Sequence, residues 1–211
     1  DRLIRDYRLS PYDAGVLARG VTRGDGVRED VIQPLKSVFA GPIVIGGAAV
    51  GINAREMLGF FDLAYAVRGD GEAVMPDLLA RYGARVPWRD VPGLVVREQG
   101  EIVEDSPLRR ADDLDALPRP NLHRYIDVQA YAQYNSPLQV QTKRGCALRC
   151  IYCVYNEIEG RAYRLRSPQR VADEIERLVS ETGINHIEFT DSTFNIPLPH
   201  AKAVLRAVTA K

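Results

Sequence analysis

Residues 139–156 read Gln-Val-Gln-Thr-Lys-Arg-Gly-Cys-Ala-Leu-Arg-Cys-Ile-Tyr-Cys-Val-Tyr-Asn and contain all three cysteines of the 211-residue chain. Cys146, Cys150 and Cys153 follow the spacing Cys-x3-Cys-x2-Cys. Thiolates are the ligands that iron–sulfur clusters and zinc prefer, and a short loop of three can surround one metal centre. The loop has no fourth ligand, which leaves one coordination position for a substrate or cofactor. This stretch therefore predicts a site for chemistry.

Other interpretations of the cysteines stay open at this point. A disulfide framework is disfavoured because the count is odd and the thiols crowd one loop. A zinc-stabilised binding module would need a fourth ligand, and zinc sites normally bring a histidine at short spacing, whereas His123 and His186 are remote. The bacterial ferredoxin pattern, Cys-x2-Cys-x2-Cys-x3-Cys-Pro, differs in both spacing and count.

The loop resembles the signature of the radical SAM family, in which an aromatic residue precedes the last cysteine, as Tyr152 does here. The resemblance implies that Cys146, Cys150 and Cys153 hold a [4Fe-4S] cluster. It further implies that the amino and carboxylate groups of S-adenosylmethionine chelate the remaining iron, and that Tyr152 lies against the adenine.

Composition sets the outer bounds. With 45% hydrophobic and 27% charged residues, the chain can bury one good core or two small ones. Its 28 basic and 28 acidic residues balance, which gives no electrostatic reason for a nucleic-acid or anionic-membrane partner. No long apolar run or signal segment is seen, and free thiols suit a reducing cytosol, so we expect a cytoplasmic protein. The missing initial methionine and the helical pattern at the end suggest a fragment.

Residues 1–90 alternate short apolar runs with helical patterns, which predicts βαβ units and a parallel sheet. Expected strands cover 13–21, 43–45 and 63–67. The second ends at Gly46-Gly47 and the third at Gly69-Asp70-Gly71-Glu72. Ligands of open α/β sheets bind beyond such strand ends, although glycines there are also common as simple turns. A flavin or nicotinamide oxidoreductase using the Gly46-Gly47 turn remains an alternative, disfavoured because Ala48 replaces the middle glycine of the dinucleotide fingerprint.

This half looks like the later part of the cobalamin-binding, flavodoxin-like domain that precedes the barrel in many radical SAM proteins. The resemblance implies that Gly46 and Gly47, with Gly69, Gly71 and Glu72 in the second turn, line a pocket for the nucleotide tail of cobalamin. The Asp-x-His-x-x-Gly motif that offers a histidine to cobalt in some such domains is absent from the chain.

Residues 91–136 form the predicted connection, with a hairpin that turns at Gln99-Gly100. Residues 113–120 are similar to the Leu-Asp-x-Leu-Pro-x-Pro bridge that is usual between the two domains of the family, and a plain solvated linker is the alternative. Residues 137–211 are expected to begin the barrel with a strand at 139–142, a helix capped by Ser167, a strand at 187–190 and a helix at 197–210.

Polar residues follow the second of these strands. The resemblance implies that Asp191 and Ser192 contact the amino group of S-adenosylmethionine, and the alternative is that Asp191 caps a turn. Arg161, Arg164 and Arg166 are expected on one solvated face of a strand or turn, with a bond to a carboxylate as the alternative for Arg166, and His200 on the surface of a helix.

The sequence therefore predicts an α/β protein in which a partial flavodoxin-like (Rossmann-type) parallel sheet precedes the start of a partial (β/α)6, TIM-like radical SAM barrel. The resemblance implies an enzyme that cleaves S-adenosylmethionine reductively to a 5′-deoxyadenosyl radical. Cobalamin-dependent methyl transfer or cyclisation would follow on an unidentified small molecule or natural product. The expected electron donor is a flavodoxin or ferredoxin, and neither nucleic acid nor membrane is an expected partner.

Overall fold

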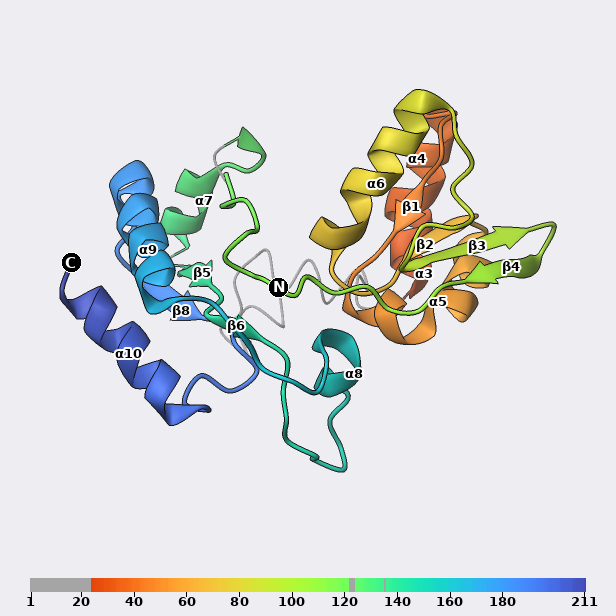
Figure 1. Cartoon of the computed structure of the whole chain (residues 1–211). Coiled ribbons are helices and arrows are strands. Elements are labelled where there is room, and N and C mark those ends of the chain that lie inside the picture. Colours follow the sequence, from red (N-terminus) through yellow and green to blue (C-terminus); the bar gives the residue numbers. More distant parts are fainter. Residues whose placement is uncertain (1–23, 122–123, 135) are drawn as a thin grey trace, which may run out of the picture.

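The computed structural model describes residues 24–121, 124–134 and 136–211, and its elements fall into two groups that lie on opposite sides of the molecule (Figure 1). The strand expected over 13–21 and His123 lie outside the described residues. No helix in the described part of the chain is long and apolar enough to cross a membrane.

The first group builds a four-stranded sheet with helices around it. Its elements are α3 (Gly24–Val27), the π-helical turn η1 (Arg28–Ile32), α4 (Gln33–Val38), β1 (Val44–Ile45), α5 (Ala48–Phe61), β2 (Tyr65–Val67), α6 (Gly71–Ala84), β3 (Leu94–Glu98) and β4 (Glu101–Asp105).

The order of this sheet is β1-β2-β3-β4. β1 and β2 pair in parallel as predicted, whereas β2–β3 and β3–β4 pair antiparallel, so the sheet is mixed. The predicted hairpin is confirmed, because Gln99 and Gly100 both adopt positive φ, as a tight hairpin turn requires. Its strands extend this sheet, although the sequence placed them in the connecting segment.

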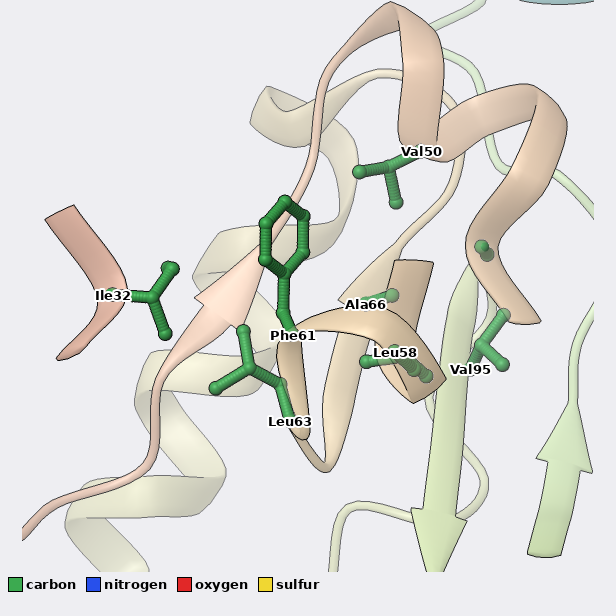
Figure 2. Packing of buried hydrophobic residues seen from close by; sticks show 8 residues of the cluster. Ile32, Val50, Leu58, Phe61, Leu63, Ala66 and Val95 are labelled. Carbon is green, nitrogen blue, oxygen red and sulfur yellow. The ribbon is translucent and has the colours of Figure 1, made fainter. Parts of the chain in front are cut away.

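Strand register explains how both faces of the sheet are covered. Ala66 pairs with Val95, and both side chains face α5 and η1. Figure 2 shows Ile32, Leu58 and Phe61 gathered beside them. The alternate residues of the same strands, with Val67 opposite Leu94, face α6 and pack with Val74 and Leu78. The two faces therefore hold separate apolar cores.

Two helix boundaries differ from the sequence expectation. α5 begins directly after Gly47, not after Asn53, and Asn53 instead marks a kink with non-helical φ and ψ of −126° and 44°. α6 begins at Gly71 and continues through Gly83 to Ala84. Its left-handed cap is Arg85, a conformation that the sequence pattern assigned to glycine.

The second group surrounds two short pairs of strands. Its elements are α7 (Val128–Gln133), β5 (Leu138–Val140), β6 (Lys143–Arg144), α8 (Tyr155–Glu159), β7 (Arg164–Leu165), α9 (Pro168–Thr182), β8 (Ile187–Phe189) and α10 (Leu198–Thr209).

β5 and β8 pair in parallel, and α9 lies between them in the sequence, as expected for a βαβ unit. Leu138 and Val140 turn toward α9 and α10, where they join a core with Val171, Leu178 and Val204. The predicted ends of α9 are confirmed: the Ser167 side chain accepts a hydrogen bond from the Arg170 amide, and Gly183 closes the helix with φ of 72°.

The segment before α7 docks onto the start of α9. Both carboxylate oxygens of Asp115 accept from the Ser167 amide, at 2.9 and 3.1 Å. The Arg170 guanidinium donates to the Asp115 carbonyl. Leu114 is buried. These contacts fix the segment at Leu114 and Asp115, whereas residues 118–120 are exposed.

Candidate cofactor site at the cysteine loop

The cysteine loop leaves the second group immediately after β6. Its entry is fixed by Gly145, which has φ of 90° and whose Cβ, if present, would lie 2.0 Å from the Ala162 carbonyl oxygen. The Cys146 amide then donates to the Gly160 carbonyl at 2.9 Å. Only glycine fits this close approach, so the backbone before the first cysteine is held against the strand that returns from the loop.

The three thiols differ in exposure. Cys146 is buried, whereas Cys150 and Cys153 are exposed, and all three are free. Among the described residues, no group of three or more His, Cys, Asp or Glu side chains is arranged to hold a metal ion. The convergence of sulfurs that the sequence predicts is therefore not seen in this arrangement. The donor chemistry still fits an iron–sulfur cluster, since three thiolates lie on one short loop. Tyr152 is exposed between them.

A half-buried carboxylate supports the base of the loop. Glu159, at the end of α8, accepts from the Gly145 amide at 2.9 Å and from Gln141 Nε2 at 3.0 Å. Burial and the neighbouring Glu159 charge raise the pKa of the Tyr155 hydroxyl far above its ordinary value. α8 packs against α5 of the first group, which places this support between the two groups (Figure 1).

Asp191 follows β8 and binds the residues just before the cysteine loop. Its carboxylate accepts from the Thr142 amide at 2.7 Å and from the Thr142 hydroxyl, and it pairs with Lys143 Nζ at 2.9 Å. The side chains of Lys143 and Asp191 are both fully buried. A direct contact to S-adenosylmethionine stays a prediction, since the carboxylate would have to leave these partners to make it. Ser192 Oγ donates to the Gly145 carbonyl at 3.3 Å.

The two glycine turns meet at a cavity of about 280 Å³. Gly47, Gly69, Gly71 and Glu72 line it, and Gly46 does not. A Cβ added at Gly47 or Gly71 would meet no atom within 4 Å, so these backbones face open space that a ligand could fill. Gly69 is different, because its Cβ would lie 1.9 Å from the Arg109 carbonyl oxygen and would block a contact within the chain itself.

Asp70, Glu72 and Arg144 line this cavity, and Arg164 pairs with Asp70; we call these four charged residues the junction. Arg144 binds both oxygens of Glu72, at 2.7 and 3.3 Å, and its Nη1 lies 3.4 Å from Asp70. The junction joins the first sheet to the strands that flank the cysteine loop.

The environment sets the ionisation of the junction. The hydrogen bond from Arg144 holds the pKa of the Glu72 carboxyl below its ordinary value. Burial alone would raise the pKa of Asp70, but hydrogen bonds from Arg164 and the Ala111 amide outweigh it and lower that pKa. Both acids are therefore carboxylates at neutral pH.

Sequence reasoning missed most of the junction. Arg164, expected in solvent, pairs with Asp70, and its side chain is only 13% exposed. Arg166 pairs with Glu174 on α9, eight positions along the chain, as its alternative predicted. His200, expected on the surface, is buried, with its Nε2 2.9 Å from the Arg166 carbonyl.

A second cavity, of about 330 Å³, lies on the other side of the junction. Gln139 and Thr190 line it from β5 and the end of β8, and the docked segment around Pro118 closes it. β5 alternates strictly, since Leu138 and Val140 are buried in the helical core while Gln139 turns away from it. This cavity is therefore lined by the face of β5 that turns away from the helical core, and also by Glu174 of α9.

The family comparison covers the whole cysteine loop. The model of the Radical SAM superfamily matches residues 140–211. The cysteine loop lies within this matched segment, and the residues of β5 and the end of β8 that line the second cavity lie in or beside it.

Similar proteins extend the likeness into the first group. The chain is similar to the structure of the radical S-adenosylmethionine methyltransferase TsrM from Kitasatospora setae with cobalamin and [4Fe-4S] cluster bound. The TM-score is 0.76 at 28% identity, over 87% of this chain and 36% of that one.

Two curated relatives differ in their reactions. Tryptophan 2-C-methyltransferase of Streptomyces laurentii is 24% identical, over 86% of this chain and 38% of its own length. Anaerobic magnesium-protoporphyrin IX monomethyl ester cyclase of Cereibacter sphaeroides is 28% identical, over 83% of this chain and 30% of its own length. The chain thus spans well under half the length of each.

Proposed function

We propose that the full-length protein is a cobalamin-dependent radical SAM enzyme that acts on a small molecule or natural product. The carrying observation is that the matched three-cysteine loop lies beside a glycine-lined cavity at the carboxyl ends of β1 and β2. When bound, the [4Fe-4S] cluster supplies the electron that cleaves S-adenosylmethionine to a 5′-deoxyadenosyl radical, and cobalamin supplies the methyl-transfer or cyclisation chemistry.

Cys146, Cys150 and Cys153 would hold the cluster. The chain supports them by fixing the backbone at Gly145, through the Ala162 contact and the hydrogen bond to Glu159. Since Cys150 and Cys153 are exposed, they can approach the buried Cys146 without disturbing a packed core. Tyr152 would lie against the adenine of S-adenosylmethionine.

Gly47, Gly71 and Glu72 would form the edge of the cobalamin pocket, with Gly46 and Gly69 shaping the two turns. The support is the open space in front of the Gly47 and Gly71 backbones. The mixed sheet and the β5–α9–β8 unit would then belong to a partial flavodoxin-like domain and a partial radical SAM barrel.

We propose that Ser192, rather than Asp191, contacts S-adenosylmethionine directly. Its hydroxyl donates to the Gly145 carbonyl at 3.3 Å and could turn toward a ligand. Asp191 would act through Thr142 and Lys143 by fixing the strand end. An external flavodoxin or ferredoxin would deliver the electron, and the protein would work in the cytoplasm.

Anaerobic reconstitution of the full-length protein tests this function. We expect about four irons and four sulfides per chain, the composition of a [4Fe-4S] cluster, together with bound cobalamin. Cys150→Ala should lose the cluster and should produce no 5′-deoxyadenosine, because one of three thiolates is gone. A colourless protein with one zinc would instead support the zinc-stabilised module, and bound flavin or nicotinamide would support the oxidoreductase.

Product analysis separates the two reactions. Methyl transfer predicts a product in which a methyl group replaces one hydrogen, with S-adenosylhomocysteine from the S-adenosylmethionine that donates the methyl group and 5′-deoxyadenosine from the one that removes the hydrogen. Cyclisation predicts 5′-deoxyadenosine, no S-adenosylhomocysteine and a product with no added methyl. The likeness to TsrM, which covers most of this chain, favours methyl transfer as the first assay.

A further inference from the structure

The two cavities share one wall. Glu72, Gln141 and Arg144 line both the glycine-lined cavity and the second cavity beside β5. We call these three residues the partition. Glu72 begins α6 in the first group, whereas Gln141 and Arg144 come from the chain between β5 and the cysteine loop. The wall therefore exists only where the two groups meet.

Arg144 is held in one orientation by the partition and the junction. Its Nε donates to Gln141 Oε1 at 2.9 Å, and its two terminal nitrogens bind the two Glu72 oxygens. Its side chain is only 18% exposed. Burial alone would lower the pKa of Arg144, but the hydrogen bond and charge of Glu72 raise it. A planar, forked donor is needed here, since a lysine ammonium cannot satisfy both carboxylate oxygens and Gln141 together.

A continuous series of hydrogen bonds leads from the partition to the first cysteine. Arg144 binds Gln141, and Gln141 donates to Glu159 Oε1 at 3.0 Å. The other oxygen of Glu159 accepts from the Gly145 amide, one residue before Cys146. Hydrogen bonds through Arg144, Gln141 and Glu159 thereby connect Glu72 to the backbone just before the first cysteine.

Glu72 is the member most open to change. Its side chain is 43% exposed and lies beside Gly71, whose backbone faces the open part of the glycine-lined cavity. Glu72 lines this cavity, so a ligand that fills it would contact the Glu72 side chain. Any shift of Glu72 then acts on Arg144, and through Gln141 and Glu159 on the cysteine loop.

We infer that Glu72 and Arg144 are positioning residues that couple ligand binding in the glycine-lined cavity to the geometry of the cysteine loop. The inference rests on the proposed function, since it takes cobalamin as the ligand of the cavity and S-adenosylmethionine as the ligand at the loop. Coupling of this kind is reciprocal, so each ligand changes the affinity of the other by the same factor.

The test measures that factor directly in the full-length, cluster-reconstituted protein. The Kd of hydroxocobalamin is determined by visible absorbance with and without saturating S-adenosylmethionine. We expect the two Kd values to differ by about fivefold or more in the wild type, the lower end of typical coupling between sites. In Glu72→Gln and in Arg144→Gln, the ratio should fall to about one, even where cobalamin still binds.

Controls separate coupling from folding. Glu98→Gln removes the same charge from a glutamate that also pairs with an arginine, Arg89, but lines neither cavity, and it should keep the wild-type ratio. Arg144→Lys keeps the positive charge but lacks the forked pair of donors, and it should give an intermediate Kd ratio. If Arg144→Gln does not fold, Arg144→Lys takes its place in the test. Iron content and thermal midpoint are compared in every variant.

Three results would overturn the inference or its basis, and they can be told apart. A wild-type ratio of one, or variants that keep the wild-type ratio, would remove the coupling role while leaving the enzyme assignment intact. A wild type that binds neither cobalamin nor a cluster would remove the proposed function itself, and the inference with it.

Discussion

At the scale of the residue, the region around the cysteine loop is organised by charges without access to water. Lys143 and Asp191 are fully buried against each other, and Asp70 is buried between two arginines. A buried charge that loses its partner keeps its desolvation cost, so these pairs hold strand ends in place more than they add stability. Lys143 and Arg144, which belong to these pairs, directly precede the cysteine loop.

Asp191→Asn is expected to destabilise the full-length protein by about 3–5 kcal/mol, because it leaves the Lys143 ammonium buried without a counter-charge. Chemical denaturation would measure the loss. The double variant Lys143→Met with Asp191→Asn should recover part of it. If Asp191 were instead a direct ligand, Asp191→Asn would weaken binding of S-adenosylmethionine with little change in stability.

Asp70 predicts a pH dependence. Its pKa is lowered from 3.8 in the folded protein, so the unfolded state binds the proton more readily. The stabilising contribution is present above the unfolded pKa and is lost as the pH falls through the folded one. Comparing wild type with Asp70→Asn, the difference in unfolding free energy should be largest at neutral pH and should shrink below about pH 4. A constant difference across that range would contradict the shift.

At the scale of the element, α9 connects the segment 113–120, the second core and the cysteine-loop strands. Its first turn is capped by Ser167 and bound by Asp115. Ser167→Ala should cost about 1 kcal/mol, seen as roughly fivefold faster hydrogen exchange in the first turn of α9. Ser180→Ala, on the exposed side of the same helix, should leave that turn unchanged. Equal effects from both would rule out the cap as the cause.

The elements that the sequence predicted are those specified by local pattern. The βαβ unit of β5, α9 and β8 follows from alternating apolar residues, a serine cap and a closing glycine, and the hairpin follows from Gln99-Gly100. The start of α5 at Ala48 and the cap at Arg85 differ from the local signals, which favoured Asn53 as the N-cap and a glycine as the C-terminal cap.

The candidate site was predictable only in part, because some of its contacts join residues that are distant in the sequence. The cysteine spacing and the glycine turns can be read from adjacent residues. The junction cannot, because Glu72 and Arg144 lie 72 positions apart, and Asp70 and Arg164 lie 94 apart. In the sequence, an arginine near a strand that binds a distant carboxylate cannot be told from one that is exposed to solvent. Asp191 presented the same difficulty, since its partners precede the cysteine loop.

At the scale of the whole molecule, apolar packing and polar contacts have separate places. The first group has apolar cores on both faces of its sheet, the second has its own core, and the junction between them is charged. Interfaces of this composition permit relative motion more readily than apolar ones.

Separate cores predict separate responses to cavities. Leu58→Ala should cost about 2–5 kcal/mol and speed hydrogen exchange in β2 and β3, because Leu58 is fully buried under that sheet. Leu178→Ala should do the same for β5 and the middle of α9. Each substitution should leave the other group near its wild-type exchange rates. If both groups exchanged faster in each variant, the molecule would unfold as one cooperative unit.

The partition contains one acid and one base, Glu72 and Arg144, that are distant in the chain, together with Gln141. A natural variant that loses the acid leaves Arg144 with Asp70 as its remaining carboxylate partner, and one that loses the base leaves Glu72 without its arginine. We therefore expect evolution to replace positions 72 and 144 together, so that their identities covary among homologous sequences even where the surrounding segments diverge.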